Sequence, residues 1–471
     1  MQGKYARKRK TPVFSILVIL ILILAAALVI IFRDKLPETW VTAPPETGAA
    51  TTLPAETTVP PTTVPPTTVP PTTEAPVDPI ATTASFTVTG DLLMHLPVIQ
   101  SCWDKETNNW IFDPIFAYIA PYVQKADYAV ANLETTLRGE HPNYPYRGNP
   151  LFNCPDGIAA ASLNAGFDML LTANNHCYDT QTGGVIRTLE VLEEAGLESL
   201  GTQKAKDDPD YKVIEVNGIR VGMTAYTFET QDGLPDTPSI NAIQCQPDSF
   251  GLINSFDYDQ LDKFYAEIGT QFEAMETEGA EAIVVYIHWG DEYKLKPNSY
   301  QKKIAQKLCD MGVDVIVGGH PHVIEPVDLL TSSEDEDHKT LIIYSTGNAV
   351  SNQRAHVMDL KTGHTEDGIL FSFTLVKYSD GTVEVLDTSC VPTWVRMTGG
   401  RKSYTILPLE KSLMDQWKET FQIGDSTYSA CVDSCNRTLA LVGEGLEKAQ
   451  EWFDARHAAK LEQLTGSAAT E

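Results

Sequence analysis

Short apolar runs alternate along the chain with longer stretches in which apolar residues recur at helical spacing. Six runs, each four to six residues long and rich in branched and aromatic side chains, predict buried β-strands at 86–89, 128–131, 169–172, 282–287, 313–317 and 341–344. Helical spacing predicts helices over 156–165, 183–195, 257–276 and 299–311. Strands that alternate with helices indicate an α/β fold.

One segment departs from this alternation. Residues 213–216 and 219–226 read as two strands joined by Asn217-Gly218, a dipeptide typical of a tight β-hairpin. The two strands of a hairpin are antiparallel, so we expect mixed sheets.

The first 84 residues differ in composition from the rest of the chain. Residues 1–12 carry five basic side chains, and residues 13–32 form an uncharged, mostly apolar stretch, about the 20 residues that a helix needs to cross a bilayer. Residues 33–84 are rich in threonine and proline and contain Thr-Thr-Val-Pro-Pro three times in tandem from Thr57, which predicts an extended stalk without a core. The basic tail should stay in the cytoplasm, so we expect a single-pass protein of the cell membrane whose main domain is extracellular.

A cleaved signal peptide is the alternative interpretation of this N-terminal segment. The apolar run is longer than the core of a usual export signal, and Arg33-Asp34-Lys35 follows it instead of small residues. These two features favour an uncleaved anchor.

Net charge restricts the class of partner. The chain has a net charge of −28 at pH 7; removing the five basic residues of the tail from the 35 leaves 30 against 63 acidic ones, or −33. A surface of this sign disfavours binding to nucleic acid, so no nucleic-acid partner is expected.

The C-terminal part is predicted to be a helical extension over 397–471, with helical spacing at 409–421 and 428–464. It serves either as a packing element or as a separate partner-binding module. The eight cysteines show no C-x-x-C zinc pattern, and Cys431 and Cys435, four residues apart, either form a disulfide or remain free.

Residues with metal-binding side chains follow the predicted strands. Open α/β sheets place their sites beyond the carboxyl ends of strands, so these residues are expected to converge at one rim; they are Asp91, Glu134, Asn175, His288, His320 and His322. Imidazole, carboxylate and amide ligands suit a divalent metal such as Mn, Fe or Zn, whereas a structural zinc site would favour thiolates. Taken singly, each residue also fits a helix cap or a turn.

A candidate catalytic pair lies beside Asn175. His176 is placed to act as a general acid or base next to such a metal site. Asp179 either orients the His176 imidazole or caps the following helix.

Together these motifs resemble one bacterial family. The resemblance is carried by Thr89-Gly-Asp-Leu, Ala131-Asn-Leu-Glu-Thr, Leu171-Thr-Ala-Asn-Asn-His-Cys-Tyr-Asp, His288-Trp-Gly-Asp-Glu-Tyr, Gly319-His-Pro-His-Val and Tyr344-Ser-Thr-Gly-Asn. Over 85–396 the chain resembles the CapA family of poly-γ-glutamate capsule synthesis proteins, which are similar to calcineurin-like metallophosphoesterases. The resemblance implies a four-layer sandwich of two mixed β-sheets flanked by helices. It also implies metal positions for the six ligand candidates and the acid/base position for His176.

Two departures from the metallophosphoesterase pattern affect the metal count. The first motif of that pattern is Asp-x-His, but this chain has Leu93 where the histidine would stand. The bridging Asp of the pattern is replaced in this chain by Asn132-Leu-Glu134. Glu134 is then the expected bridge, His95 is a candidate substitute ligand, and the site holds one or two ions.

The function implied is that of a membrane-anchored hydrolase that uses a metal-activated water in the synthesis of a capsule or cell-wall polymer. One alternative is a non-catalytic component that assembles or exports poly-γ-glutamate together with the membrane subunits of its synthase. Another is a secreted phosphoesterase with a different substrate.

Overall fold

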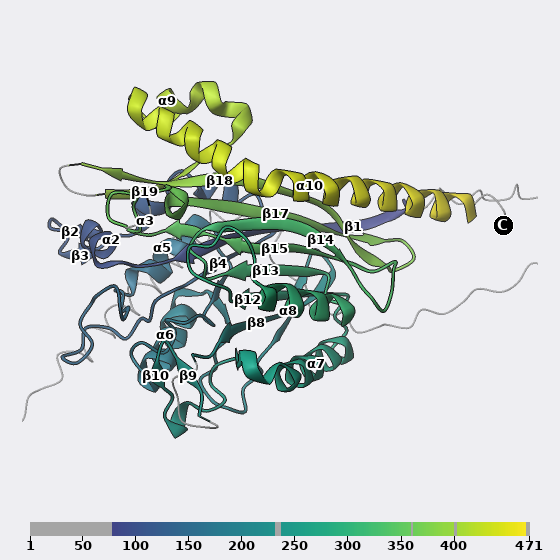
Figure 1. Cartoon of the computed structure of the whole chain (residues 1–471), viewed down its shortest axis with the longest axis horizontal. Helices are drawn as coiled ribbons and strands as arrows, with labels where there is room; N and C mark the ends of the chain where they lie inside the picture. The colour runs from purple at the N-terminus through teal and green to yellow at the C-terminus, as the bar shows by residue number, and fades with distance from the viewer. Residues whose placement is uncertain (1–77, 231–236, 359–360, 400–402, 468–471) are drawn as a thin grey trace, which may run out of the picture. The chain divides into compact units, whose positions relative to one another are not determined.

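The computed structural model describes residues 78–230, 237–358, 361–399 and 403–467 (Figure 1). The predicted cytoplasmic tail (1–12), the predicted membrane helix (13–32) and the stalk up to residue 77 lie outside these residues. Within the described ranges, no helix is long and apolar enough to span a membrane. The first strand begins at Ile80, so residues 80–84 belong to the folded unit and not to the stalk.

The first sheet is built around β1 (Ile80–Leu92), which is parallel to β4 (Tyr128–Asn132) and antiparallel to β17 (Asp367–Tyr378). The strand order of this sheet is β19-β18-β17-β1-β4-β5-β6, and β16 also pairs with β1. The other strands are β5 (Met169–Leu171), β6 (Glu198–Leu200), β16 (Asn348–Val350), β18 (Val383–Thr398) and β19 (Ser403–Pro408).

The second sheet has the order β11-β8-β12-β13-β15-β14, with β7 paired to β8. Its strands are β7 (Lys212–Val216), β8 (Ile219–Phe228), β11 (Ser255–Phe256), β12 (Ala282–His288), β13 (Val315–Gly319), β14 (Ile324–Thr331) and β15 (Lys339–Thr346). The four strands β8, β12, β13 and β15 are parallel. β7 and β8 form the antiparallel hairpin predicted at Asn217-Gly218, so the expectation of mixed sheets is confirmed.

The main core lies between the two sheets. Phe86 and Val88 of β1 belong to one buried cluster with Met223 of β8 and Val284 of β12. The outer face of the second sheet packs against α7 (Leu261–Thr277) and α8 (Ser299–Asp310). The outer face of the first sheet packs against α2 (Leu96–Ser101), α3 (Asp113–Phe116), α4 (Ala120–Val123), α5 (Gly157–Ala165) and α6 (Thr182–Ala195). The predicted α/β class is confirmed.

Short elements complete the loops around these layers. The two-stranded pairs are β2 (Trp103–Asp104) with β3 (Asn109–Trp110) and β9 (Ser239–Ile240) with β10 (Ile243–Gln244). The 3-10 turns are η3 (Pro247–Ser249), η4 (Tyr258–Gln260), η5 (His364–Glu366) and η6 (Lys411–Gln416).

The C-terminal extension is only partly helical. The extension predicted over 397–471 has helical spacing only from residue 409. Its first part, 397–398 and 403–408, belongs to β18 and β19, because alternating burial of Tyr404 and Ile406 against the first sheet favours a strand. The helical part consists of α9 (Trp417–Thr420) and α10 (Asp425–Ser467). Both Cys431 and Cys435 in α10 are free thiols.

Helix α10 packs along the domain (Figure 1), against β18 of the first sheet and β14 of the second. Val442, Ala449 and Phe453 belong to the core between the sheets. Gly445 permits the closest approach, because a Cβ at this position would lie 1.8 Å from the carbonyl oxygen of Val327. The helix therefore closes one edge of the sandwich as a packing element.

Two glycines of α10 give a matched test of this packing. We expect Gly445→Ala to lower the free energy of unfolding by about 1–3 kcal/mol, because the added methyl collides with β14. Gly443→Ala should instead raise it by roughly 0.5–1 kcal/mol, since no atom of the described residues lies within 4 Å of a Cβ there. Chemical denaturation of the two variants measures the difference, and equal effects of both would contradict close packing of α10 on β14.

Candidate metal centre

The six ligand candidates lie where strands of the two sheets end. Asp91 of β1 pairs in register with Asn132 of β4 and Asn348 of β16. Gly90 is required for this approach, because a Cβ there would lie 1.8 Å from the carbonyl oxygen of Gly347. His288 ends β12 in the other sheet. Ligands separated by up to 231 residues are thereby brought to one rim.

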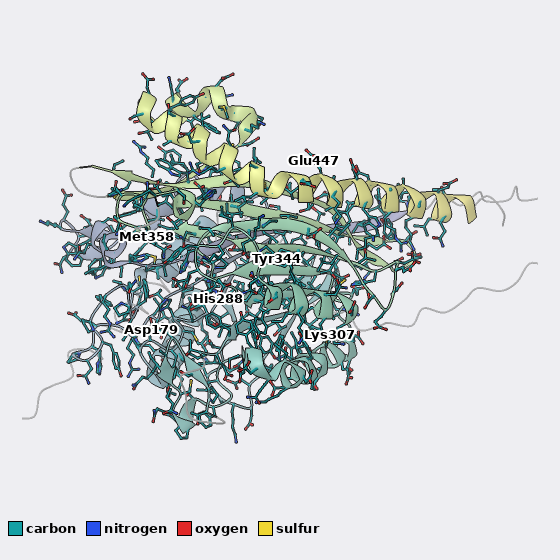
Figure 2. The ribbon with its side chains drawn as sticks, in the orientation of Figure 1. Asp179, His288, Lys307, Tyr344, Met358 and Glu447 are labelled. Carbon is teal, nitrogen blue, oxygen red and sulfur yellow. The ribbon has the colours of Figure 1, made fainter. Side chains whose placement is uncertain are left out.

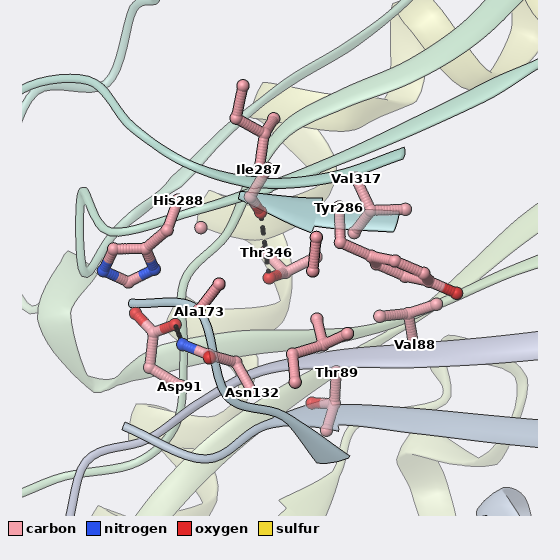
Figure 3. A pocket seen from close by; sticks show the side chains of 14 residues that line it. Val88, Thr89, Asp91, Asn132, Ala173, Tyr286, Ile287, His288, Val317 and Thr346 are labelled. Atoms are coloured by element: carbon pink, nitrogen blue, oxygen red, sulfur yellow. Dashed lines mark hydrogen bonds between the residues drawn. The ribbon is translucent and has the colours of Figure 1, made fainter. Parts of the chain in front are cut away.

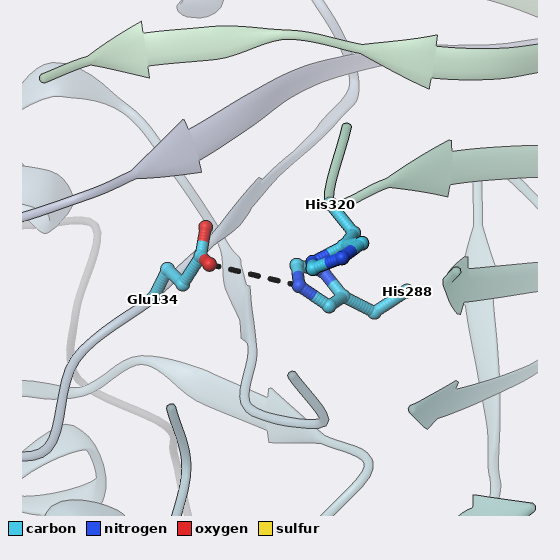
Figure 4. Close-up of side chains that lie close together, drawn as sticks. All are labelled: Glu134, His288 and His320. Atoms are coloured by element: carbon cyan, nitrogen blue, oxygen red, sulfur yellow. Dashed lines mark ion pairs between the residues drawn. The ribbon is translucent and has the colours of Figure 1, made fainter. Parts of the chain in front are cut away.

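Two groups of ligand atoms share one carboxylate. Glu134, His288 and His320 form the first group, and Asp91, Glu134 and His322 form the second; within each group the ligand atoms lie within 4.8 Å of one another. In Figure 4 the Glu134 carboxylate faces the imidazoles of His288 and His320. Glu134 is therefore the residue that the two groups have in common.

Asn175 adds a fourth candidate metal ligand, its amide oxygen, to the first group. Its Oδ1 lies 2.8 Å from Nε2 of His288. The structure thus brings together all six predicted ligand positions, four around one group and three around the other, with Glu134 common to both.

The Glu134 carboxylate supplies the test of whether a cation fits. The residue is completely buried, and neither of its carboxylate oxygens has a hydrogen-bond partner among the described residues. Burial and the nearby Asp91 carboxylate raise the pKa of Glu134 well above its usual value. An isolated buried carboxylate is costly unless a positive charge compensates it, so this donor set fits a divalent cation.

The three histidines of the two groups are buried, and for His288 and His320 burial favours the neutral, metal-binding form. Burial lowers the pKa of His288 to about 3, although the nearby Asp91 carboxylate opposes the shift. Burial, together with His288 and His322, also lowers the pKa of His320 well below its usual value, and Nδ1 of His320 has no hydrogen-bond partner among the described residues.

Asp91 is the ionised member of the centre. Burial on its own would raise its pKa, but His322 and Asn132 hold it below the usual carboxyl value. Nδ1 of His322 lies 3.1 Å from Oδ2 of Asp91, and Asn132 donates a 2.8 Å hydrogen bond to Oδ1.

The backbone of the ligand loop is strained. His320 and His322 have φ angles of 98° and 55°, in the left-handed region that residues other than glycine seldom occupy. Such strain persists where the surrounding structure fixes the conformation, and it is concentrated at functional sites. In this loop it directs two imidazoles into one centre.

His176 and Asp179 form a hydrogen-bonded pair beside the centre. Nδ1 of His176 lies 2.7 Å from Oδ2 of Asp179. Asp179 is held in turn by Asn241, which donates a 2.8 Å bond to Oδ1, and by the backbone N–H of Phe152 at 2.5 Å from Oδ2. Figure 2 labels Asp179, just before α6, and His288 at the end of β12. Of the two roles predicted for Asp179, the structure favours orienting the imidazole.

Two asparagines next to the ligands position the site. Asn174 donates bonds to Oδ1 of Asn132 at 3.1 Å and to the Leu133 carbonyl at 2.9 Å, and its own Oδ1 accepts from the His176 backbone N–H. Both Asn132 and Asn174 lie in the quoted motifs next to ligand residues, but no role was predicted for them.

His95, the candidate substitute for the histidine missing at Leu93, belongs to neither ligand group. Its Nδ1 lies 3.3 Å from the Asn352 backbone N–H donor, and its ring packs on Phe152. The second group therefore has three predicted ligands, from Asp91, Glu134 and His322.

A small cavity of about 20 Å³ lies next to the rim (Figure 3). Its walls are mostly apolar residues of both sheets, and Asp91, Asn132 and His288 line one end of it. The volume suits roughly one water molecule, so a substrate must approach the ligands from elsewhere.

Comparison with known proteins assigns the family. The family model described as bacterial capsule synthesis protein PGA_cap matches residues 85–353, which include all the candidate ligands, His176 and Asp179. The chain belongs to this family.

Two curated members are similar to the chain in sequence. It is 29% identical over 272 residues to the capsule biosynthesis protein CapA of Bacillus anthracis, covering 57% of this chain and 60% of that protein. It is 27% identical over 345 residues to the PGA biosynthesis protein CapA of Bacillus subtilis (strain 168), covering 71% and 80%. The calcineurin-like phosphoesterase YfkN from Bacillus subtilis, a solved structure, aligns with 15% identity and a TM-score of 0.37 over 74% of this chain and 98% of that one.

Replacement of the shared carboxylate tests the centre without any assay of activity. Because the pKa of Glu134 is higher in the folded than in the unfolded chain, its ionisation destabilises the metal-free fold as pH rises above the usual carboxyl range. At pH 7 we expect Glu134→Gln to raise the free energy of unfolding of the metal-free protein by about 1–3 kcal/mol. The same variant should lose the stabilisation by metal, which is about 2.7 kcal/mol at a hundredfold excess over Kd.

Glu325 provides the matched control. It is also a buried carboxylate with one unpartnered oxygen, and burial raises its pKa to about 7, but it lies outside both ligand groups. Thermal unfolding with and without Mn²⁺ should show that Glu325→Gln keeps the metal-dependent shift in Tm. A metal-dependent shift retained in Glu134→Gln would show that Glu134 is not a ligand.

Proposed function

We propose that this chain is a metal-dependent hydrolase of capsule or cell-surface polymer biosynthesis. The observation that carries the proposal is the pair of ligand groups joined at Glu134 with a His176–Asp179 pair beside them. A structural metal site has no use for such a pair, whereas hydrolysis requires proton transfer next to the metal. The proposal includes the fold that the motifs imply, which is a four-layer metallophosphatase-like sandwich.

The ligands define the kind of cofactor. Glu134, Asn175, His288 and His320 would hold one divalent ion, and Asp91, Glu134 and His322 would hold a second. Two carboxylates, an amide and three imidazoles suit Mn, Fe or Zn. A divalent cation supplies Lewis acidity there, which polarises the scissile bond and lowers the pKa of water.

His176 handles the proton of the leaving group in this proposal. The 2.7 Å contact with the Asp179 carboxylate places a hydrogen on Nδ1, which leaves Nε2 to exchange a proton with the substrate. Asp179 cannot reorient, because Asn241 and the Phe152 backbone hold its two oxygens. Asp179 is therefore a positioning residue, and His176 is the candidate catalytic residue.

The family name suggests the polymer. The two relatives are named for capsule and PGA biosynthesis, which supports poly-γ-glutamate or another cell-surface polymer as substrate and the membrane subunits of a polyglutamate synthase as partners. The apolar segment 13–32 would anchor the chain in the cell membrane with residues 1–12 in the cytoplasm and the hydrolase outside.

A non-catalytic role in polymer assembly is the second candidate. Leu93, buried where the metallophosphoesterase pattern has a ligand histidine, leaves the second group with three ligands from the chain. A centre that holds only one ion could stabilise the fold or bind polymer without cleaving it.

Turnover by the purified full chain tests these candidates. With added Mn²⁺, Fe²⁺ or Zn²⁺ we expect hydrolysis of a phosphoester or of a γ-glutamyl amide. His176→Ala should lower kcat by about 10²–10⁴-fold with unchanged metal content, because the imidazole transfers a proton and binds no metal.

His457→Ala is the matched histidine control. His457 lies on α10, where its Nδ1 is 2.8 Å from the hydroxyl of Tyr378 at the end of β17. It is remote in sequence from the ligand motifs, and its loss should leave turnover unchanged. Bound metal without turnover in the wild type would reject the hydrolase and favour the assembly role. Equal activity of His176→Ala and wild type would reject the catalytic role of His176.

A further inference from the structure

A chain of buried amides leads from the start of β16 to a tyrosine next to the metal centre. Asn348 is fully buried, and its Nδ2 lies 2.9–3.1 Å from three oxygens, those of Gln353 Oε1 and the His322 and Thr365 carbonyls. Three acceptors around one nitrogen fix the orientation of the amide. Gln353, itself buried, therefore presents its Oε1 to Asn348 and its Nε2 to Tyr293.

This orientation determines what the Tyr293 hydroxyl can do. Nε2 of Gln353 donates a 3.1 Å hydrogen bond to the phenol oxygen. Since a phenol has one hydrogen, the hydroxyl keeps that hydrogen for a different acceptor. The neighbouring carboxylate of Glu292, which is exposed to solvent, is an acceptor within reach in the free protein.

The backbone holds Tyr293 at the centre. Its N–H donates a 2.8 Å bond to the carbonyl of Pro321, the residue between the two ligand histidines of the loop. Its φ angle is 64°, a strained value for an aromatic residue. The ring centroid lies 6.1 Å from that of His322, and Glu134 is among the charges that act on the phenol.

We infer that the Tyr293 hydroxyl donates a hydrogen bond to the substrate oxygen that gains negative charge during hydrolysis. In a phosphoester this atom is a non-bridging oxygen, and in a γ-glutamyl amide it is the carbonyl oxygen. The tyrosine keeps its proton throughout, so it binds the substrate and does not act as base or nucleophile. Fixed donors of this kind stabilise developing charge because they need no reorganisation during the reaction.

The inference rests on the proposed function and extends it to a residue that no motif comparison assigned. The inference also explains why Gln353 bonds to the Tyr293 hydroxyl and why the Tyr293 backbone is strained. A tyrosine that served only for packing would need neither feature. An incoming oxygen takes the place of Glu292 as acceptor.

The test uses the full chain purified in detergent and loaded with Mn²⁺. Binding of inorganic phosphate is measured by titration calorimetry, and turnover is measured on a phosphoester and a γ-glutamyl amide. We expect Tyr293→Phe to weaken phosphate binding about tenfold or more, as expected for loss of a hydrogen bond to a charged group, and to lower kcat with little change in bound manganese or Tm. Tyr300→Phe is the matched control, since the Tyr300 side chain is exposed and its ring packs on Tyr258; it should behave as wild type.

Each other outcome is decisive. Wild-type phosphate affinity and kcat in Tyr293→Phe would overturn the inference and leave the hydrolase intact. Loss of manganese together with phosphate binding would also overturn it, because Tyr293 would then support the ligand loop. A loaded wild type that neither binds phosphate nor cleaves either substrate would reject the proposed function, and the inference with it.

Discussion

The centre depends on one buried carboxylate to which no described residue donates a hydrogen bond. Glu134 is enclosed at the junction of the two ligand groups, where the imidazoles of His288 and His322 and the carboxylate of Asp91 lie near its oxygens. A fold tolerates such a group only if something else in its working state offsets the cost of desolvation. The other features of the rim, which are buried histidines, bonded asparagines and strained loop backbone, are arranged around that requirement.

The two sheets supply the rigidity that keeps this arrangement in place. Asp91 comes from the central strand of one sheet and His288 from an interior strand of the other. The core between the sheets fixes the distance between them, and α10 adds Val442 and Phe453 to that core. Small changes in the packing of this core would therefore change the distances between the ligands directly.

Part of this could be read from the sequence, because buried parallel strands leave a strong local signal. The runs ending near Asp91 and His288 predicted both the strands and the convergence of their ligands. Asn241 could not be predicted, since it lies between two-residue strands without any periodic pattern and reaches Asp179 only through the tertiary fold. Tyr293 is the last residue of a recognised motif, but its role depends on an amide chain from Asn348 that no spacing encodes. The predicted C-terminal extension over 397–471 starts with strand β19, because residues 403–408, which precede the predicted helical spacing at 409, pair with β18.

Strand β1 also has a mechanical consequence. It enters the fold at Ile80 and reaches the rim at Asp91, roughly 35 Å further along an extended strand. Its backbone pairs with β17 on one side and with β4 on the other. A force that pulls the chain at Ile80 acts along these ladders in shear, so many hydrogen bonds resist it together instead of opening one at a time. The metal rim lies at the end of the strand opposite Ile80, so a load applied at Ile80 is borne by the strand ladders before it reaches the ligands.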